Sequence, residues 1–432
     1  MLAELKDVFD KMNRDRYAIG YDLSREFAQI SYCKIDSDSP DTLSTVEGGD
    51  AYNIPLVLSK RRSDGQWCIG ADAISAVDEG DGELVTDLLS LALAKELVTV
   101  QRAQYQATDL LALFIKRSLA LLPMMATPEK IADIVITVRN ADEQMIPVLQ
   151  ETVGVLKHNS DKISFISYEE SVFYYMLYQS GELQNHQILV CDASEEYLHS
   201  YRLERNNFVN PALATVEAVE YRNFPVKDSY TPDNKRDERF LQIAQELCEN
   251  RIYSGIFLIG EGFYEDWCKD SLRFLCKNRR VFKGNNLFSK GAALAAREKA
   301  NPSGFQKNIV FLGTDKLKAN IGIGIFKDGH ETHLPLLEAG VHWYEAKGSI
   351  EVILNETNIL PISIEYVTKN GTAVADFPLA GLPFEAGRIT RVRINARMQS
   401  EDVIAFKVTD LGFGEIFPST GMEWEESMNI QG

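Results

Sequence analysis

The sequence predicts an α/β domain made of two similar lobes, followed by a separate antiparallel β domain. An apolar strand, an aspartate, a polar turn and a second strand occur at residues 17–33 and again at 186–203. Strand and helix patterns alternate through this part of the chain, as in α/β domains with helices on both faces of a sheet. From residue 309 onward almost no helical periodicity remains, and short alternating strands take its place.

Length and composition restrict the class of protein. The chain has 432 residues, which predicts two or three domains, and a net charge of −18 with a pI near 4.9. Nucleic-acid and anionic membrane surfaces need concentrated Lys and Arg, so we expect neither as a partner. The six cysteines contain no C-x-x-C pair and fit reduced core thiols of a cytoplasmic protein. Residues 1–15 predict a charged amphipathic helix rather than a secretion signal, and the lack of a long apolar run predicts no membrane insertion.

Within the first lobe, residues 16–185, strands and helices are expected in regular alternation. Its run DIVITV at 133–138 is β-branched at every position after Asp133, which indicates a strand buried on both faces. The other expected strands are 17–22, 27–33, 97–100 and 162–167. One helix is expected to start at about residue 71, and further helices are expected at 84–94, 108–122, 142–157 and 169–179.

The second lobe, residues 186–305, repeats this pattern, and residues 306–432 form the β domain. After the repeated strand pair, the lobe is expected to contain helices 234–250, 264–277 and 287–299 and strands 255–259 and 280–282. In the β domain, Asn370-Gly371 is a typical two-residue hairpin turn.

Asp22 and Asp192 end the first strand of the two repeated units. A duplicated lobe would place both carboxylates at one shared cleft. There they would face a nucleotide phosphate tail and its metal ion.

Several segments, in this order, together resemble a heat-shock chaperone of the seventy-kilodalton class, within the actin/hexokinase/chaperone ATPase superfamily. They are IGYDLSRE, IPLVLSKRRSDGQWCIGADAISA, DIVITV, residues 166–175, ILVCDASEEYLHSYRL, IFLIGEG, SKGAALAA, NIVFLG, FPLAGLP and RVRINARMQSEDVIAFKVTD. The resemblance implies an actin-like two-lobed nucleotide-binding-type domain at 16–305. It also implies a β-sandwich at 306–432 that resembles the peptide-binding domain, here without a helical lid.

The resemblance also implies roles for single residues. Asp22 and Asp192 would hold Mg²⁺ if a nucleotide binds, and Glu169 or Glu170 would orient the attacking water. The nucleotide cleft would be lined by Ser24, Arg25, Ser194, Glu195, Glu196, Gly260, Gly262, Lys290 and Gly291. The small residues on the adenosine side have two readings, close approach to an adenine or tight packing within the fold.

The two phosphate loops depart from the family pattern. Gly-Thr-Thr is replaced by residues 24–26, Ser-Arg-Glu, and Gly-Gly-Gly-Thr by residues 194–197, Ser-Glu-Glu-Tyr. A carboxylate about 4 Å from a phosphate charge costs on the order of 4 kcal/mol at an effective dielectric near 20. The family's catalytic lysine is also missing, since no Lys or Arg lies between Arg62 and Lys95. Arg25 either offsets the acidic charge or pairs with Glu195 or Glu196 and plugs the site.

We therefore expect a degenerate chaperone-like protein without ATP hydrolysis and without a cofactor. It would act as a protein-binding or scaffold module that takes another protein or an extended peptide through its β-sandwich. Two alternatives remain open. One is an unorthodox nucleotide-binding ATPase that uses ATP or ADP with Mg²⁺ at Asp22, Asp192 and Arg25. The other is an actin-like structural or assembly protein.

Overall fold

The computed structural model describes residues 16–430 except 47, 157–159, 228–230, 306–307, 328, 356, 368–370, 384–386 and 388. The chain divides into two units, Met1–Gly313 and Thr314–Gly432. The division lies after Gly313 rather than at the expected 305/306, because strand β17 (Ile309–Phe311) pairs with a strand of the first unit. The expected helix at 1–15 lies outside the described residues.

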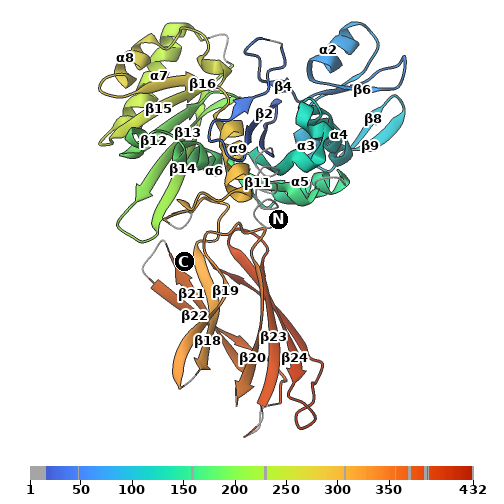
Figure 1. The fold of residues 1–432 in the computed structure, drawn as a ribbon, viewed down its shortest axis with the longest axis vertical. Coiled ribbons are helices and arrows are strands. Elements are labelled where there is room, and N and C mark those ends of the chain that lie inside the picture. The colour runs from blue at the N-terminus through green and yellow to red at the C-terminus, as the bar shows by residue number, and fades with distance from the viewer. Residues whose placement is uncertain are drawn as a thin grey trace, which may run out of the picture. The chain divides into compact units, whose positions relative to one another are not determined.

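A six-stranded sheet organises the first half of the first unit (Figure 1). Its order is β11-β10-β1-β2-β3, with β4 also paired to β2. Strand β1 is parallel to β10 and antiparallel to β2, and β10 is parallel to β11. The strands are β1 Tyr17–Leu23, β2 Phe27–Lys34, β3 Asp41–Thr42, β4 Ile54–Pro55, β10 Ile131–Val138 and β11 Ile163–Ser167. Every residue of β10 is buried, as its β-branched sequence predicts.

A second six-stranded sheet, β16-β15-β12-β13-β14-β17, repeats this topology. Strand β12 is parallel to β15 and antiparallel to β13, and β15 is parallel to β16. The strands are β12 Gln187–Asp192, β13 Tyr197–Asn206, β14 Ala212–Pro225, β15 Tyr253–Ile259 and β16 Val281–Gly284. Strands β1 and β12 hold equivalent central places, so Asp22 and Asp192 lie at equivalent positions.

Two helices cross over between the halves of the first unit. Helix α9 (Leu287–Ala300) follows strand β16 of the second sheet in sequence but packs on the first sheet, through small residues such as Ala292 and Ala296. Helix α6 (Tyr168–Leu177) follows the first sheet but packs on the second. The outer face of the second sheet is covered by α7 (Asp233–Cys248) and α8 (Lys269–Leu275).

Two glycines allow these helices to approach closely. A Cβ on Gly20 of β1 would lie 2.1 Å from the carbonyl oxygen of Ser289 on α9. A Cβ on Gly291 of α9 would lie 2.1 Å from the carbonyl oxygen of Ser171 on α6. Any side chain at either position would force backbone segments apart, so both glycines fix the distance between the layers.

The other face of the first sheet carries helices α4 (Ala107–Leu119) and α5 (Met145–Val155). Tyr21, which points away from the α9 side of β1, forms a 2.8 Å hydrogen bond with Ser118 of α4. The remaining short elements of this half are β5 Leu58–Lys60, β6 Trp67–Ile69, α2 Gly70–Asp78, β7 Leu84–Val85, α3 Leu88–Leu93, β8 Leu97–Val100, β9 Ala103–Gln106, η1 Pro123–Ala126, η2 Pro128–Lys130, η3 Ser160–Lys162 and η4 Gly181–Gln184.

Two expected helices are wrong in extent. The stretch 84–94 begins as strand β7, which pairs with β5, and only then continues as α3. The stretch 264–277 is shortened to α8, after a 3₁₀ turn η5 (Glu261–Phe263). The start of α8 is fixed from outside, because the carboxylate of Asp237 on α7 accepts the N–H groups of Asp270 and Ser271.

The second unit, the β domain, consists of two antiparallel four-stranded sheets, β19-β18-β21-β22 and β20-β23-β24-β25. Their inner faces meet where Phe377 and Phe406 have ring centroids 6.2 Å apart. The strands are β18 Ala319–Lys327, β19 His330–Leu337, β20 Lys347–Asn355, β21 Ile359–Tyr366, β22 Gly371–Pro378, β23 Ile389–Met398, β24 Val403–Gly412 and β25 Glu423–Asn429. The hairpin expected here joins β21 to β22, but Gly371 lies in β22 and pairs with Tyr366, so it is not the second residue of a two-residue turn. Asn370 lies outside the described residues.

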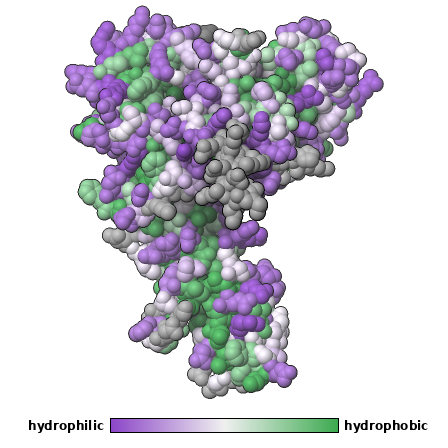
Figure 2. All heavy atoms as spheres, viewed as in Figure 1, coloured by the Kyte–Doolittle hydropathy of each residue, from purple (hydrophilic) through white to green (hydrophobic). Residues whose placement is uncertain are grey.

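Hydrophobic residues gather on the face of the β domain that Figure 2 turns to the viewer. No helix in the described part of the chain is long and apolar enough to cross a membrane.

Candidate functional site

The two aspartates end equivalent strands and are both buried. Asp22 is 2% exposed and Asp192 is 0% exposed. In the sheet register Asp22 lies opposite Thr137 of β10, and Asp192 lies opposite Ile259 of β15. Because a buried carboxylate must find a partner, the groups that satisfy each one determine what the cleft can bind.

The partner of Asp192 is Arg139, which follows β10 directly and belongs to the first half of the unit. Its Nη2 donates to Asp192 Oδ2 at 3.1 Å, and its Nε donates to Glu195 Oε2 at 2.9 Å. Its Nη1 donates to the hydroxyl of Tyr201 at 2.7 Å. The guanidinium of Arg139 thus connects the end of β10 to three parts of the other half. These are the end of β12 through Asp192, the following turn through Glu195 and strand β13 through Tyr201.

Arg139 stays protonated in this buried position. Burial alone lowers the pKa of a guanidinium, but Tyr201, Asp192 and Glu195 around it raise the pKa of Arg139 well above its ordinary value. The group also lies 5.1 Å from the centre of the Tyr168 ring, a cation–π contact.

The partner of Asp22 is neutral. The hydroxyl of Tyr168 at the start of α6 donates to Asp22 Oδ1 at 2.5 Å. Burial raises the pKa of Asp22 to about 8; the Tyr168 hydrogen bond lowers it, whereas the charges of Asp192 and Glu195 raise it. Asp22 therefore keeps its proton through neutral pH, in which form it is a poor metal ligand.

Aromatic rings pack against the tyrosines that bond Asp22 and Arg139. The ring of Tyr168 stacks on Phe288 of α9 at a centroid distance of 3.8 Å, and Phe288 meets Tyr201 edge to face at 5.5 Å. Burial raises the pKa of both tyrosines, so their hydroxyls stay protonated and act as fixed hydrogen-bond groups.

The first turn, residues 24–26, closes on itself and on the second turn. The Ser24 hydroxyl donates to the carbonyl of Phe27 at 2.8 Å. Arg25 contributes its backbone N–H, which donates to Glu195 Oε1 at 3.1 Å. Arg25 does contact Glu195, but the guanidinium that pairs with this carboxylate belongs to Arg139.

The second turn, residues 194–196, binds back to Asp192. The N–H of Ser194 donates to Asp192 Oδ1 at 3.0 Å, and its hydroxyl donates to the same oxygen. Glu196 accepts the N–H of Val226 through its main-chain carbonyl. In this turn the groups that would have to cradle a phosphate are a carboxylate and a serine already bonded to Asp192.

Further contacts join the two halves around these turns. Lys227 forms an ion pair with Glu26, and the side-chain amide of Asn53 donates to Glu261 Oε1 at 2.5 Å. The same Asn53 accepts from Gln29 at 2.6 Å.

Gly260 and Gly262 pack tightly in this structure. A Cβ on Gly260, whose φ is +94°, would lie 2.5 Å from the backbone of Ala193 and Ser194. A Cβ on Gly262 would lie 2.6 Å from the side chain of Val226. Gly291 contacts α6 as described above, and Lys290, beside it on α9, donates its N–H to the carbonyl of Asn286. These small residues therefore have packing roles in the fold itself.

Glu169 and Glu170 lie in the first turn of α6 and are both buried. Ser167 caps this helix by accepting the N–H of Glu170 at 3.3 Å. The structure thus brings Asp22, Asp192, Ser24, Ser194 and Glu195 together at one place. It adds Arg139, Tyr168 and Tyr201, which the sequence analysis missed.

A signal for Arg139 was present in the sequence. It follows the buried run DIVITV directly, and parallel neighbouring strands end at the same edge of a sheet. A charged residue at that position is therefore placed beside Asp22 by the topology alone.

The donor set does not fit a nucleotide phosphate with its magnesium ion. Asp192 and Glu195 are already bonded to a cation from the chain, and Asp22 carries a proton. A phosphate would have to displace Arg139 and lie against the carboxylate of Glu195.

Comparisons with known proteins add the family. No curated protein matches this chain. Residues 316–430 match a profile described as a domain of unknown function, DUF8552. Residues 39–314, more than half of the chain, match the profile described as the C-terminal part of a family of unknown function, DUF5716. The chain therefore belongs to the DUF5716 family.

Proposed function

We propose that this protein is a non-hydrolysing, chaperone-like member of the actin/hexokinase/chaperone superfamily whose β domain binds other proteins. The observation that carries the proposal is the Arg139 guanidinium, which bonds Asp192 and Glu195 from the opposite half. The repeated sheet topology and the crossed helices α6 and α9 support an actin-like core. In this proposal the chain's own cation joins the two halves, and the cleft serves architecture.

A cytoplasmic location belongs to the same proposal. All six cysteines are free thiols in the structure, which fits a reducing compartment.

Calorimetric titration with ATP and ADP, with and without Mg²⁺, tests the cleft. We expect no heat of binding up to millimolar nucleotide and no phosphate release. The Arg139→Gln variant is titrated alongside, because it removes the competing cation but leaves the carboxylate of Glu195. Micromolar binding to the parent protein would refute the proposal and favour the nucleotide-binding alternative.

An exposed sheet edge supports the protein-binding role. Three of the four edge strands carry groups that discourage pairing: Pro335 in β19, Lys347 and Glu351 in β20, and three glutamates in β25. Strand β22, GTAVADFP, carries a single charge, Asp376, and its one proline, Pro378, is its last residue. Its Val374 is 65% exposed. Such an edge can accept an extended segment as an added strand.

Binding of labelled neutral peptides rich in Val and Thr tests this edge. Thr372→Lys is expected to abolish binding, because an edge lysine opposes strand addition. The matched control is Ser349→Lys on β20, an exposed strand residue of the other sheet. Equal binding by both variants would exclude β22 as the site.

A further inference from the structure

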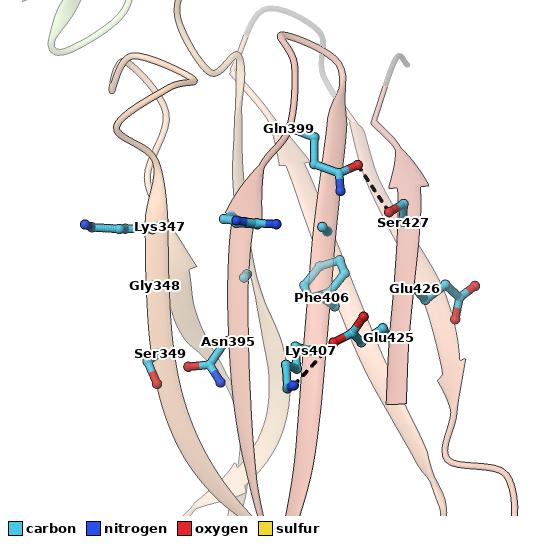
Figure 3. A pocket seen from close by; sticks show the side chains of 13 residues that line it. Lys347, Gly348, Ser349, Asn395, Gln399, Phe406, Lys407, Glu425, Glu426 and Ser427 are labelled. Atoms are coloured by element: carbon cyan, nitrogen blue, oxygen red, sulfur yellow. Dashed lines mark hydrogen bonds and ion pairs between the residues drawn. The ribbon is translucent and has the colours of Figure 1, made fainter. Parts of the chain in front are cut away.

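A shallow hollow crosses the outward face of the sheet β20-β23-β24-β25 (Figure 3). Its volume is about 810 Å³, and it is lined by residues of all four strands. The polar side chains in it are those of Lys347, Ser349, Asn395, Arg397, Gln399, Lys407, Glu425, Glu426 and Ser427.

Strand register arranges outward side chains of this sheet in rows, three of which cross all four strands. One row is Glu351, Arg393, Thr409 and Glu423, and the next is Ser349, Asn395, Lys407 and Glu425. The last is Lys347, Arg397, Ala405 and Ser427.

Charges are matched in the first two rows and unmatched in the last. Arg393 bonds Glu351 at 2.7 Å, and Lys407 bonds Glu423 at 2.8 Å and Glu425 at 3.3 Å. Lys347 and Arg397 lie directly opposite each other, and neither has an acidic partner among the described residues. Like charges directly opposite each other on neighbouring strands destabilise a sheet.

The unmatched pair is conspicuous because the domain is acidic. Residues 314–432 contain seventeen Asp and Glu against ten Lys and Arg. Protection of the β20 edge accounts for Lys347. It gives no reason for a second cation, Arg397, opposite it on the inner strand β23, without an acidic partner among the described residues, when carboxylates are in excess. A local rule broken without a structural gain is expected at functional positions.

We propose that Lys347 and Arg397 anchor a binding site for an extended acidic segment of a partner protein. Their ammonium and guanidinium groups receive carboxylates of the segment. The next row adds the Ser349 hydroxyl and the Asn395 amide, which face each other across β20 and β23 (Figure 3). These neutral groups form hydrogen bonds with the backbone of the bound segment, next to the residue whose carboxylate contacts Lys347 or Arg397. Charge complementarity with these two cations is local and favours a short segment dense in carboxylates over a whole second copy, which brings a net charge of −18.

A peptide suits the hollow better than a free phosphate ion. Phosphate sites typically use backbone N–H groups of a helix start or a glycine-rich turn. Here the backbone that lines the hollow belongs to paired strands, which leaves side chains spread over four strands.

This site goes beyond the proposed function, since it lies on the other sheet from β22 and takes a different ligand. Fluorescence anisotropy of a short labelled peptide in which Glu alternates with Ser tests it on the full chain. The reference probe has Gln in place of every Glu. We expect Lys347→Gln and Arg397→Gln each to weaken binding about tenfold, the effect of losing one charge-assisted contact. The matched control is Arg393→Gln, which removes an ion-paired cation from the same strand and is expected to bind nearly as the parent does.

Raising the ionic strength to about 1 M should also release the peptide, because screening then acts within about 3 Å. Several results would overturn the proposal. The first is that the acidic peptide does not bind the parent protein saturably. The second is that the Gln probe binds with equal affinity, and the third is that Arg393→Gln weakens binding as much as Lys347→Gln and Arg397→Gln do. Displacement of the peptide by inorganic phosphate at similar concentration would assign the site to a small anion instead. Self-association abolished by Lys347→Gln would assign it to a second copy. Neutral-peptide binding at β22 is measured in the same variants, so failure at one sheet is distinguishable from failure at the other.

Discussion

Asp22 and Asp192 lie at the ends of equivalent strands, and both are almost completely buried, yet their partners differ. Asp192 bonds a cation, Arg139, and Asp22 bonds the neutral hydroxyl of Tyr168. Burial of a carboxylate is tolerated when the group is either paired with a charge or kept protonated. The first unit uses both solutions within one cleft. The Arg139 pair of Asp192 and the proton of Asp22 leave neither aspartate available to a metal ion.

Loss of Arg139 is expected to have the largest effect. Arg139→Gln leaves Asp192 and Glu195 without their cation, and breaking a buried ion pair in this way costs about 3–5 kcal/mol. Chemical denaturation of the variant measures the free energy of unfolding. The matched control is Arg205→Gln on β13, whose Nη1 donates to Gln184 at 3.1 Å, and about 1 kcal/mol is expected there. Similar losses in both variants would contradict the special role of Arg139.

Asp192→Asn tests the same contact from the acidic side. The amide keeps the shape of the side chain but removes the charge that faces Arg139. A loss of about 1.5–3 kcal/mol is expected, the usual value for a hydrogen bond to a charged group. An unchanged midpoint of denaturation would mean that Glu195 and Tyr201 alone satisfy the guanidinium.

Asp22→Asn is expected to change stability in the opposite direction. The pKa of Asp22 is raised from 3.8 to about 8, so the folded chain keeps a proton that the unfolded chain loses. The stability that comes from this carboxyl is fully present below pH 3.8 and is lost as the pH rises toward 8. The variant lacks this loss. A shift of about four units at about 1.4 kcal/mol per unit sets an upper bound of about 6 kcal/mol, and we expect the variant to be more stable than the parent at pH 8 by about 1–3 kcal/mol.

Unfolding curves of both proteins between pH 5 and pH 8 measure this difference. A constant difference across the range would show that Asp22 is ionised throughout, which would contradict its raised pKa.

Tyr168→Phe gives the smallest expected effect. It removes one hydrogen bond to Asp22 and keeps the ring that stacks on Phe288, for a loss of about 0.5–1.5 kcal/mol. Because this hydrogen bond lowers the pKa of Asp22, its removal should shift the pH dependence to higher pH. A shift to lower pH would contradict the assigned donor.

Much of the fold follows from local patterns in the sequence. The run at 131–138 forms a fully buried strand because its β-branched side chains suit a strand covered on both faces. Strand β23 follows from its sequence in the same way, since apolar and polar residues alternate along it. Val392, Ile394 and Ala396 are buried, and Arg391 and Arg393 are exposed.

The errors come from contacts distant in sequence. Leu84 and Val85 have helical neighbours, but pairing with β5 makes them a strand, and Asp87 with φ +55° separates that strand from α3. The start of α8 depends on Asp237 of another helix. No local pattern contains either constraint.

The site divides in the same way. Its aspartates and turns were readable because each follows an apolar strand in a repeated unit. The cations considered were Arg25, which lies within a turn, and Lys290, which opens a run of small residues. Arg139 pairs with Asp192 and Glu195, which lie 53 and 56 positions further along the chain. These partners depend on how the two halves of the first unit meet.

Hydrogen–deuterium exchange at the cleft, with and without ATP and Mg²⁺, tests the central claim most directly. The amides of Arg25 and Ser194 donate to Glu195 and Asp192, so their exchange reports whether the cleft is held closed. We predict slow exchange in the parent protein that nucleotide does not change, and faster exchange in Arg139→Gln. Slower exchange of these amides in the parent when ATP and Mg²⁺ are added would contradict the account.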